Sequence, residues 1–334
     1  MQRVAMLRGA ALAVVAAGAL LVSGVDAQGT EARDPGAAAP SRWAADFDRM
    51  DEDVRLRLLT PSDPRANWVR AALDKTDIVS QVSHFAAARV AAPQEKLYQA
   101  SLAMACLQPT IPVLAECDAV DRLADWARRD EDNGVPSILL ADRARRRGER
   151  DKMIADIDEA AGKPRFDEYW SDGALALWEY FREARLDYDP AARAYAALQY
   201  ASELPVTWPT AVQGVCANPR EAANEQLRAA CARLGDALAR HAASWTGRLI
   251  GVTLMYRNAS DPQGRERAEA SRSATNRLRA RCDDARRVRA DGIESADAAQ
   301  RARELAASDG WIRAQARYGE VAACERLAGG ATRP

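Results

Sequence analysis

The chain has 334 residues, a formal net charge of −1 and a hydrophobic content of 48%. This length and apolar content are sufficient for a buried core, which argues against disorder of the whole chain. The near-neutral charge argues against a dedicated nucleic-acid-binding protein, which would carry a basic excess. Two histidines, His84 and His241, are too few for a multi-histidine metal site, and we predict neither a metal nor another cofactor.

Residues 1–27 have the three-part pattern of a secretory signal peptide. Arg3 and Arg8 form the positive start, an apolar run extends from Gly9 to Val25, and Val25-Asp26-Ala27 offers a cleavage site. The run is near the lower length limit for a membrane-spanning helix, so an uncleaved anchor is the alternative. No later stretch is apolar enough to span a bilayer. The preference for arginine over lysine, with the abundance of alanine, indicates a GC-rich bacterial genome. We therefore predict a periplasmic or secreted bacterial protein.

Residues 28–42 are rich in Ala, Gly and Pro without periodicity, which predicts a flexible linker. Helix-forming residues dominate the rest, and apolar residues recur at steps of three and four. The longest such stripe predicts one helix from about Glu221 to Tyr256, with His241 packed on its apolar face between Leu238 and Trp245.

The pattern as a whole predicts an all-α fold of stacked antiparallel helical hairpins, as in a TPR-like or irregular α-solenoid. Three prolines crowd the stretch Leu204–Pro219, where a division into two lobes would fall. The N-terminal helical-hairpin lobe would then span residues 43–204, and the C-terminal helical lobe would span residues 219–330.

The segment at about residues 136–164 resembles one tetratricopeptide or Sel1-like helical repeat. In such a unit, small side chains let two helices approach closely around a tight turn, and larger ones fill the groove. The residues that carry the resemblance are Leu140, Ala141, Ala144, Gly148, Ile157 and Ala160, and Pro164 closes the unit. Ser137 occupies the position of the usual aromatic residue. The resemblance implies a surface that binds proteins or peptides.

Six cysteines in an exported chain allow three disulfides in fifteen connectivities. Spacing favours neighbours, so we predict that Cys106 pairs with Cys117, Cys216 with Cys231, and Cys282 with Cys324. Buried free thiols are the alternative. The absence of a Cys-x-x-Cys motif argues against a thioredoxin-like redox site.

No catalytic motif accompanies the remaining candidates. His84 has Ser80 and Ser83 nearby, but helix neighbours alone do not make a catalytic Ser–His pair, so we interpret His84 as structural. The acidic run Asp46–Asp53 lacks the Gly and Glu of a calcium loop. Asp130-Glu131-Asp132 has the composition of a solvated helix end. Glu294-Ser295 lacks the motifs that follow the catalytic acid of lytic transglycosylases.

We therefore expect a non-enzymatic, exported helical scaffold that binds a protein or peptide partner and no nucleic acid. The alternative is a cell-wall or polysaccharide-acting enzyme whose site is assembled from distant residues. That enzyme would show two carboxyl groups of shifted pKa beside an exposed tryptophan, and Trp170 and Trp178 are the first candidates.

Overall fold

The computed structural model describes residues 63–74, 77–107, 114–118, 121–183, 193, 196, 197, 200, 201, 204, 207–217, 224–293 and 298–330, all within one compact unit. Regular structure in these residues is helical, and β-type pairing is limited to two isolated bridges, which confirms the predicted all-α fold. The predicted signal peptide, the linker, the acidic run Asp46–Asp53 and Glu294-Ser295 lie outside the described residues. Among the described helices, none is long and apolar enough to cross a membrane.

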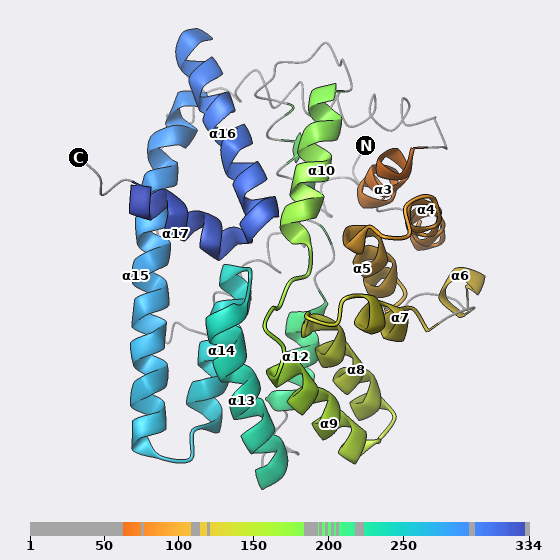
Figure 1. The fold of residues 1–334 in the computed structure, drawn as a ribbon, viewed down its shortest axis with the longest axis vertical. Helices are drawn as coiled ribbons and strands as arrows, with labels where there is room; N and C mark the ends of the chain where they lie inside the picture. Colours follow the sequence, from red (N-terminus) through yellow and green to blue (C-terminus); the bar gives the residue numbers. More distant parts are fainter. Residues whose placement is uncertain are drawn as a thin grey trace, which may run out of the picture. The chain divides into compact units, whose positions relative to one another are not determined.

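The helices pack largely in chain order, and α10 returns to close the sequence of contacts (Figure 1). Each of α3, α4, α5, α7, α8 and α9 contacts the next, the contacts continue from α9 through α13, α14 and α15 to α16, and α10 then packs against both α16 and α3. The short helix α6 contacts α4. The helices are α3 (Pro64–Leu73), α4 (Ile78–Ala91), α5 (Lys96–Ala105), α6 (Ala115–Asp118), α7 (Arg122–Arg129), α8 (Val135–Arg146), α9 (Arg150–Ala161), α10 (Trp170–Glu183), α12 (Trp208–Cys216), α13 (Glu225–His241), α14 (Trp245–Asn258), α15 (Pro262–Ile293), α16 (Ala298–Tyr318) and α17 (Glu320–Gly330).

Helices α8 and α9 form the hairpin expected for residues 136–164. Ala141, Ala144, Ile157 and Ala160 are buried, and Leu140 packs partly buried against the same core. Gly148 lies in the turn with a φ of 73°, a backbone conformation that suits glycine. The hairpin exists as expected, while membership of the tetratricopeptide or Sel1-like family stays a prediction.

The single helix predicted from Glu221 to Tyr256 is wrong, because the chain turns back at Ala242–Ser244. The side chain of Ser244 accepts a hydrogen bond from the Gly247 backbone N–H and caps a new helix, α14. Helices α13 and α14 then pack closely at Gly235 and Gly251, where an added Cβ would lie 2.4–2.9 Å from backbone or Cβ atoms of the facing helix. His241 is exposed at the end of α13, which corrects its predicted packing role.

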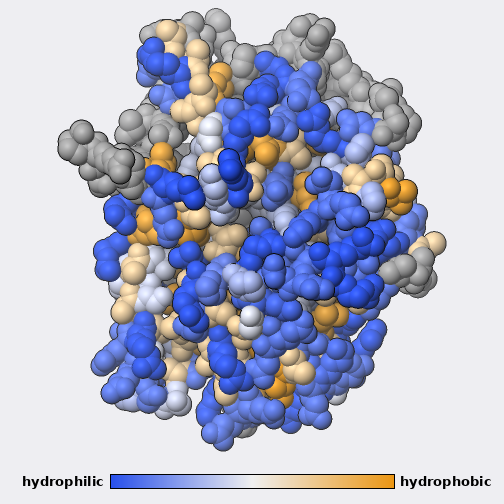
Figure 2. All heavy atoms as spheres, in the orientation of Figure 1, coloured by the Kyte–Doolittle hydropathy of each residue, from blue (hydrophilic) through white to orange (hydrophobic). Residues whose placement is uncertain are grey.

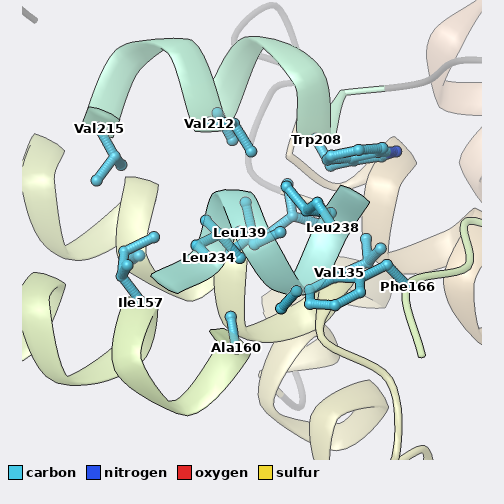
Figure 3. Close-up of a cluster of buried hydrophobic side chains, with 14 of the residues drawn as sticks. Val135, Leu139, Ile157, Ala160, Phe166, Trp208, Val212, Val215, Leu234 and Leu238 are labelled. Carbon is cyan, nitrogen blue, oxygen red and sulfur yellow. The ribbon is translucent and has the colours of Figure 1, made fainter. Parts of the chain in front are cut away.

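The largest hydrophobic cluster lies among α8, α9, α12 and α13 (Figure 3). Trp208 of α12 and Phe166 are fully buried beside Leu139, Leu234 and Leu238. Residues from both sides of the Pro-rich stretch Leu204–Pro219 therefore share one core.

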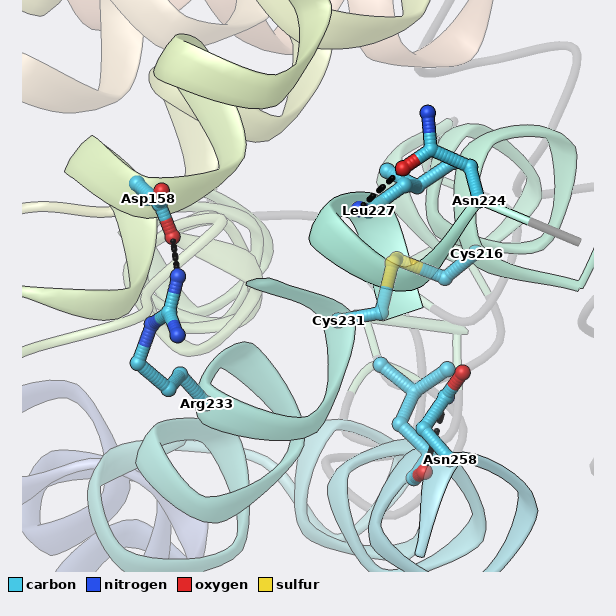
Figure 4. The surroundings of a disulfide bond; sticks show 8 residues. Asp158, Cys216, Asn224, Leu227, Cys231, Arg233 and Asn258 are labelled. Atoms are coloured by element: carbon cyan, nitrogen blue, oxygen red, sulfur yellow. Dashed lines mark hydrogen bonds and ion pairs between the residues drawn. A yellow bond between two sulfur atoms is a disulfide. The ribbon is translucent and has the colours of Figure 1, made fainter. Parts of the chain in front are cut away.

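The structure pairs the six cysteines as their spacing predicts. Cys216 and Cys231 join the end of α12 to α13 (Figure 4), Cys106–Cys117 joins the end of α5 to α6, and Cys282–Cys324 joins α15 to α17. The Cα–Cα distance is 5.6 Å in each pair. Loops of this length give about 2–4 kcal/mol of stabilisation per disulfide.

Gly134 provides a test of the packing at the start of α8. A Cβ added there would lie 2.3 Å from a ring carbon of the buried Phe166. We expect Gly134→Ala to lower the free energy of unfolding by about 1–3 kcal/mol, because the ring has no room to move. Urea unfolding with the disulfides intact measures the change.

Gly310→Ala in α16 is the matched control, because an added Cβ there meets nothing within 4 Å. We expect this variant to gain about 0.5–1 kcal/mol from the better helix propensity of alanine. Equal effects of the two substitutions would contradict the close contact at Phe166.

Candidate functional site

The candidate site is built around residues 163–169, an extended stretch between α9 and α10 that we call the central segment (Figure 1). The Gly134 N–H donates to the Arg165 carbonyl at 2.8 Å, and the Ala243 N–H donates to the Phe166 carbonyl at 2.9 Å. These bonds accompany isolated bridges from Asn133 to Arg165 and from Phe166 to Ala242. The central segment thereby joins the turn before α8 to the turn between α13 and α14.

Asp130, at the end of α7, is the charged centre of this region. Its side chain is fully buried. It accepts hydrogen bonds from Arg165 at 2.6 Å, Tyr169 Oη at 2.5 Å, Lys96 Nζ and Asn133 Nδ2 at 2.8 Å, and Trp126 Nε1 at 3.3 Å. Burial alone would raise the pKa of Asp130, but these donors and the Arg165 charge outweigh it and hold the pKa below its usual range. The predicted solvated role of Asp130 is therefore wrong.

Asn133 links Asp130 to the central segment through all of its polar atoms. Its Oδ1 accepts from the backbone N–H groups of Val135 at 3.2 Å and Asp167 at 3.0 Å. Its Nδ2 donates to Asp130 and, at 2.7 Å, to the Asp167 carbonyl. The side chain therefore fixes both the start of α8 and the path of the central segment.

Tyr169 ends the central segment in a left-handed conformation, with a φ of 61°. This conformation is unfavourable for a bulky side chain and persists only where surrounding contacts enforce it. The phenol oxygen is bound at Asp130, and the Tyr169 N–H donates to Asp167 Oδ1 at 2.8 Å. Burial and the hydrogen bond to Asp130 raise the pKa of Tyr169, so the phenol keeps its proton.

Two carboxyl groups beside Tyr169 keep protons to unusually high pH. Burial, followed by the charge of Asp167, raises the pKa of Glu168 to about 7 and that of Asp172 to about 7. Burial also raises the pKa of Asp167. Glu168 is 8% exposed, and its Oε2 has no hydrogen-bond partner. Trp170 lies between the two carboxyl groups in sequence and donates from Nε1 to the Ala201 carbonyl at 2.7 Å.

A small cavity of about 20 Å³ adjoins these residues. It is lined by Phe85, Leu97, Ser101, Met104, Glu168, Tyr169, Trp170 and Leu204. The volume is sufficient for about one water molecule. Ser101 is already hydrogen-bonded, because its Oγ accepts from Trp68 Nε1 at 2.9 Å.

The other candidates from the sequence lie elsewhere. His84 is partly buried on α4, where burial and the charge of Arg70 lower its pKa. Trp178 is buried in α10 and donates to Asp309 at 2.9 Å. The described residues contain no group of three or more His, Cys, Asp or Glu side chains placed to hold a metal ion.

Sequence reasoning missed the Asp130 centre and the central segment. The available signal was the turn Asp130-Glu131-Asp132-Asn133-Gly134, since Asp and Asn frequently bind turn backbone. This turn signal did not identify the side chains that donate hydrogen bonds to Asp130, which come from residues between 96 and 169.

Comparison with protein-family models, with curated proteins and with solved structures finds no match to this chain.

Asp130→Asn tests whether the buried charge organises the site. We expect the free energy of unfolding to fall by about 1.5–3 kcal/mol, because hydrogen bonds to a buried carboxylate are weakened while Lys96 and Arg165 are themselves partly exposed to solvent. Asp158→Asn is the control: Asp158 pairs with Arg233 at 2.5 Å on the surface (Figure 4), where ion pairs contribute less than about 1 kcal/mol. Chemical unfolding compares the two, and equal losses would show that Asp130 is not the organising charge.

The raised pKa values predict a pH dependence of stability. Glu168 and Asp172 hold their protons in the folded chain up to about pH 7 and release them at lower pH when unfolded. The unfolded state therefore binds fewer protons between about pH 5 and pH 7, and the unfolding free energy should fall as the pH rises through that window. Urea unfolding across the window should show a shallower slope for Asp172→Asn. A stability that rises with pH, or an unchanged slope in the variant, would contradict the assignment.

Proposed function

We propose that this protein is an exported, non-enzymatic interaction protein that binds a helical segment of an envelope partner through α4. The observation that carries the proposal is a row of exposed side chains along that helix, apolar at three of its four positions. The resemblance of residues 136–164 to a tetratricopeptide or Sel1-like repeat supports a binding role by analogy of architecture alone.

Export to the periplasm or the exterior is supported by the cysteines. All three pairs lie at disulfide distance, and such bonds persist in oxidising compartments. The signal-peptide pattern of residues 1–27 points to the same destination.

The exposed face of α4 has the spacing expected for packing against another helix. Val79, Ser83, Ala87 and Val90 follow one another at steps of four, four and three residues, and all are exposed. Val90 is 74% exposed and Val79 38%. Apolar side chains gather over α4 at the right of Figure 2. Ser83 is the polar member of the row, and its Oγ donates to Glu116 Oε1 on α6 at 3.4 Å. A row that is apolar at three of its four positions is typical of a docking surface, whereas single exposed apolar residues are ordinary.

A helix is the partner segment that this face fits. Ser83 and Ala87 are small, so a facing backbone can approach closely between the two valines. A rise of about 1.5 Å per residue separates Val79 and Val90 by about 16 Å, which corresponds to three turns of a bound helix. The opposite face of α4 is already used, since Val82, Phe85 and Ala88 are buried in the core.

The alternative of a polysaccharide-acting enzyme has one observation in its favour. Glu168 and Asp172 have raised pKa values and flank Trp170. However, Glu168 is nearly buried, and the adjoining cavity of about 20 Å³ takes one water molecule, which is far less than a sugar ring needs. The geometry therefore favours binding at α4 over chemistry at this site.

Site-specific photocrosslinking in intact cells tests the proposal. A photoreactive residue at position 79 and another at position 90 should each form an adduct with the same segment of one partner. The two crosslinked positions should lie about 11 residues apart in that segment, because both helices rise equally per residue. Mass spectrometry of the adducts measures this spacing.

Ser83→Asp should abolish both adducts, because it replaces the Ser83 hydrogen bond to Glu116 with a second carboxylate in the middle of the row. The matched control carries the photoreactive residue at Tyr256, a 45% exposed side chain on α14, and should give no such adduct. Adducts with unrelated proteins, or the same adduct from position 256, would overturn the proposal.

A further inference from the structure

The turn between α13 and α14 is held on two sides by hydrogen bonds. The Ala243 N–H donates to the Phe166 carbonyl at 2.9 Å, and the Ala243 carbonyl accepts from the Val321 N–H at 3.0 Å. The Trp245 N–H donates to Glu320 Oε2 at 3.1 Å. We call this three-part junction of the central segment, the turn and the start of α17 the seam.

Gly319 shows how closely α17 approaches the turn. Its φ is 80°, and a Cβ added there would lie 3.0 Å from the Ala243 Cβ. The seam therefore depends on a close fit and does not tolerate inserted atoms.

Glu168 lies within the seam. Burial and the negative charges of Asp167 and Glu320 raise the pKa of its carboxyl group, and Ser244, the capping residue of α14, lowers it by a smaller amount. Its Oε2 is buried without a hydrogen-bond partner. An ionised carboxylate in this position would be short of donors and close to two like charges, which is costly in a buried site.

The basic side chains near the seam bind groups other than Glu168. Arg165 binds Asp130, and Arg248 on α14 donates to the Ala242 carbonyl at 3.4 Å and lies 3.9 Å from Glu325 on α17. His241, two residues before Ala243 in the chain, is exposed at the end of α13. No described ion pair neutralises Glu168.

We propose that Glu168 is a proton-operated latch: protonated, it keeps the seam closed, and on losing its proton it opens the junction between the central segment, the α13–α14 turn and α17. The proton passes to solvent when the seam opens, and the carboxylate becomes hydrated. The Cys282–Cys324 disulfide still joins α17 to α15, so the opening is local and reversible.

The size of the effect follows from proton linkage. In the open state Glu168 is hydrated and titrates near its ordinary range, whereas in the closed state burial raises its pKa to about 7. A single proton linked in this way raises the opening constant by up to about tenfold per pH unit, which amounts to about 40-fold between pH 5 and pH 7. The change levels off above about pH 8.

Hydrogen exchange of the full chain, with its disulfides intact, measures the opening. The probes are the backbone amides of Ala243, Trp245 and Val321, corrected for the pH dependence of unprotected amides. Their opening constants should rise about 40-fold from pH 5 to pH 7, by the linkage above. At pH 8 low urea should leave their exchange unchanged, because a local opening exposes little surface, whereas the buried amide of Ile157 in α9 should respond strongly.

Three variants distinguish the effect of Glu168 on the pH response from the effects of other titrating groups. Glu168→Gln should make the seam amides independent of pH in this range. Asp172→Asn removes the other carboxyl group of strongly raised pKa, and His241→Gln removes the nearby histidine. Both control variants should keep the wild-type pH response at the seam.

Four results would overturn the latch. These are seam amides that do not respond to pH, a response that survives Glu168→Gln, a response lost in either control variant, and a urea dependence equal to that of Ile157. If Glu168→Gln does not fold, ¹³C NMR titration of the Glu168 carboxyl group in the wild-type chain decides the question. A midpoint near pH 7 supports the latch, and one near the ordinary glutamate value overturns it.

Discussion

The burial of the Asp130 carboxylate is the constraint on which the centre of the structure depends. A fully buried charge is tolerable only when donors surround it, and here the donors come from α5, α7, the turn before α8 and the central segment. Each donor must reach one point, so each element is placed relative to the others. Asn133 then transmits this placement to the backbone of the central segment, with all of its polar atoms engaged.

The neighbouring acids differ from Asp130 because donors and cations offset less of the cost of their own burial. Arg165 and Lys96 are the basic groups bound at Asp130, and Asp130 takes the strongest contacts of both. Arg165 also reaches Asp167, at a longer 3.3 Å, while Glu168 and Asp172 are paired with no described cation. Burial raises the pKa of Glu168 and of Asp172 with no paired cation to offset it, whereas at Asp130 the donors and the charge of Arg165 outweigh burial and lower the pKa. The left-handed backbone of Tyr169 belongs to the same arrangement, since its phenol is one of the required donors.

The features that sequence reasoning predicted correctly are those that depend on residues close together in the sequence. The cysteine pairs are separated by 11, 15 and 42 residues, and the α8–α9 hairpin has small residues and Gly148 at its turn. The break at Ala242–Ser244 was missed because the apolar stripe continues across it. Gly235 and Gly251 allow the close packing of α13 against α14, and this role is visible only when the two helices face each other. Asp130 was missed for a related reason. The composition of Asp130-Glu131-Asp132 resembles that of a solvated helix end, and the burial of Asp130 becomes evident only when residues 96 and 165–169 are brought together.

The rigid centre of the molecule supports binding at the exposed face of α4. A helix whose inner face is packed on a constrained core presents its outer face with little freedom left to lose, and binding then costs less ordering entropy. Phe85 and Ala88 anchor α4 in this way, while Arg89 pairs with Asp125 on α7 at 2.6 Å and fixes its C-terminal end. The seam at Glu168 lies where the central segment meets the α13–α14 turn, which α17 binds in turn. Three of the Asp130 donors, Lys96, Trp126 and Asn133, lie outside the seam, so the molecule can respond to pH locally while α4 keeps its position.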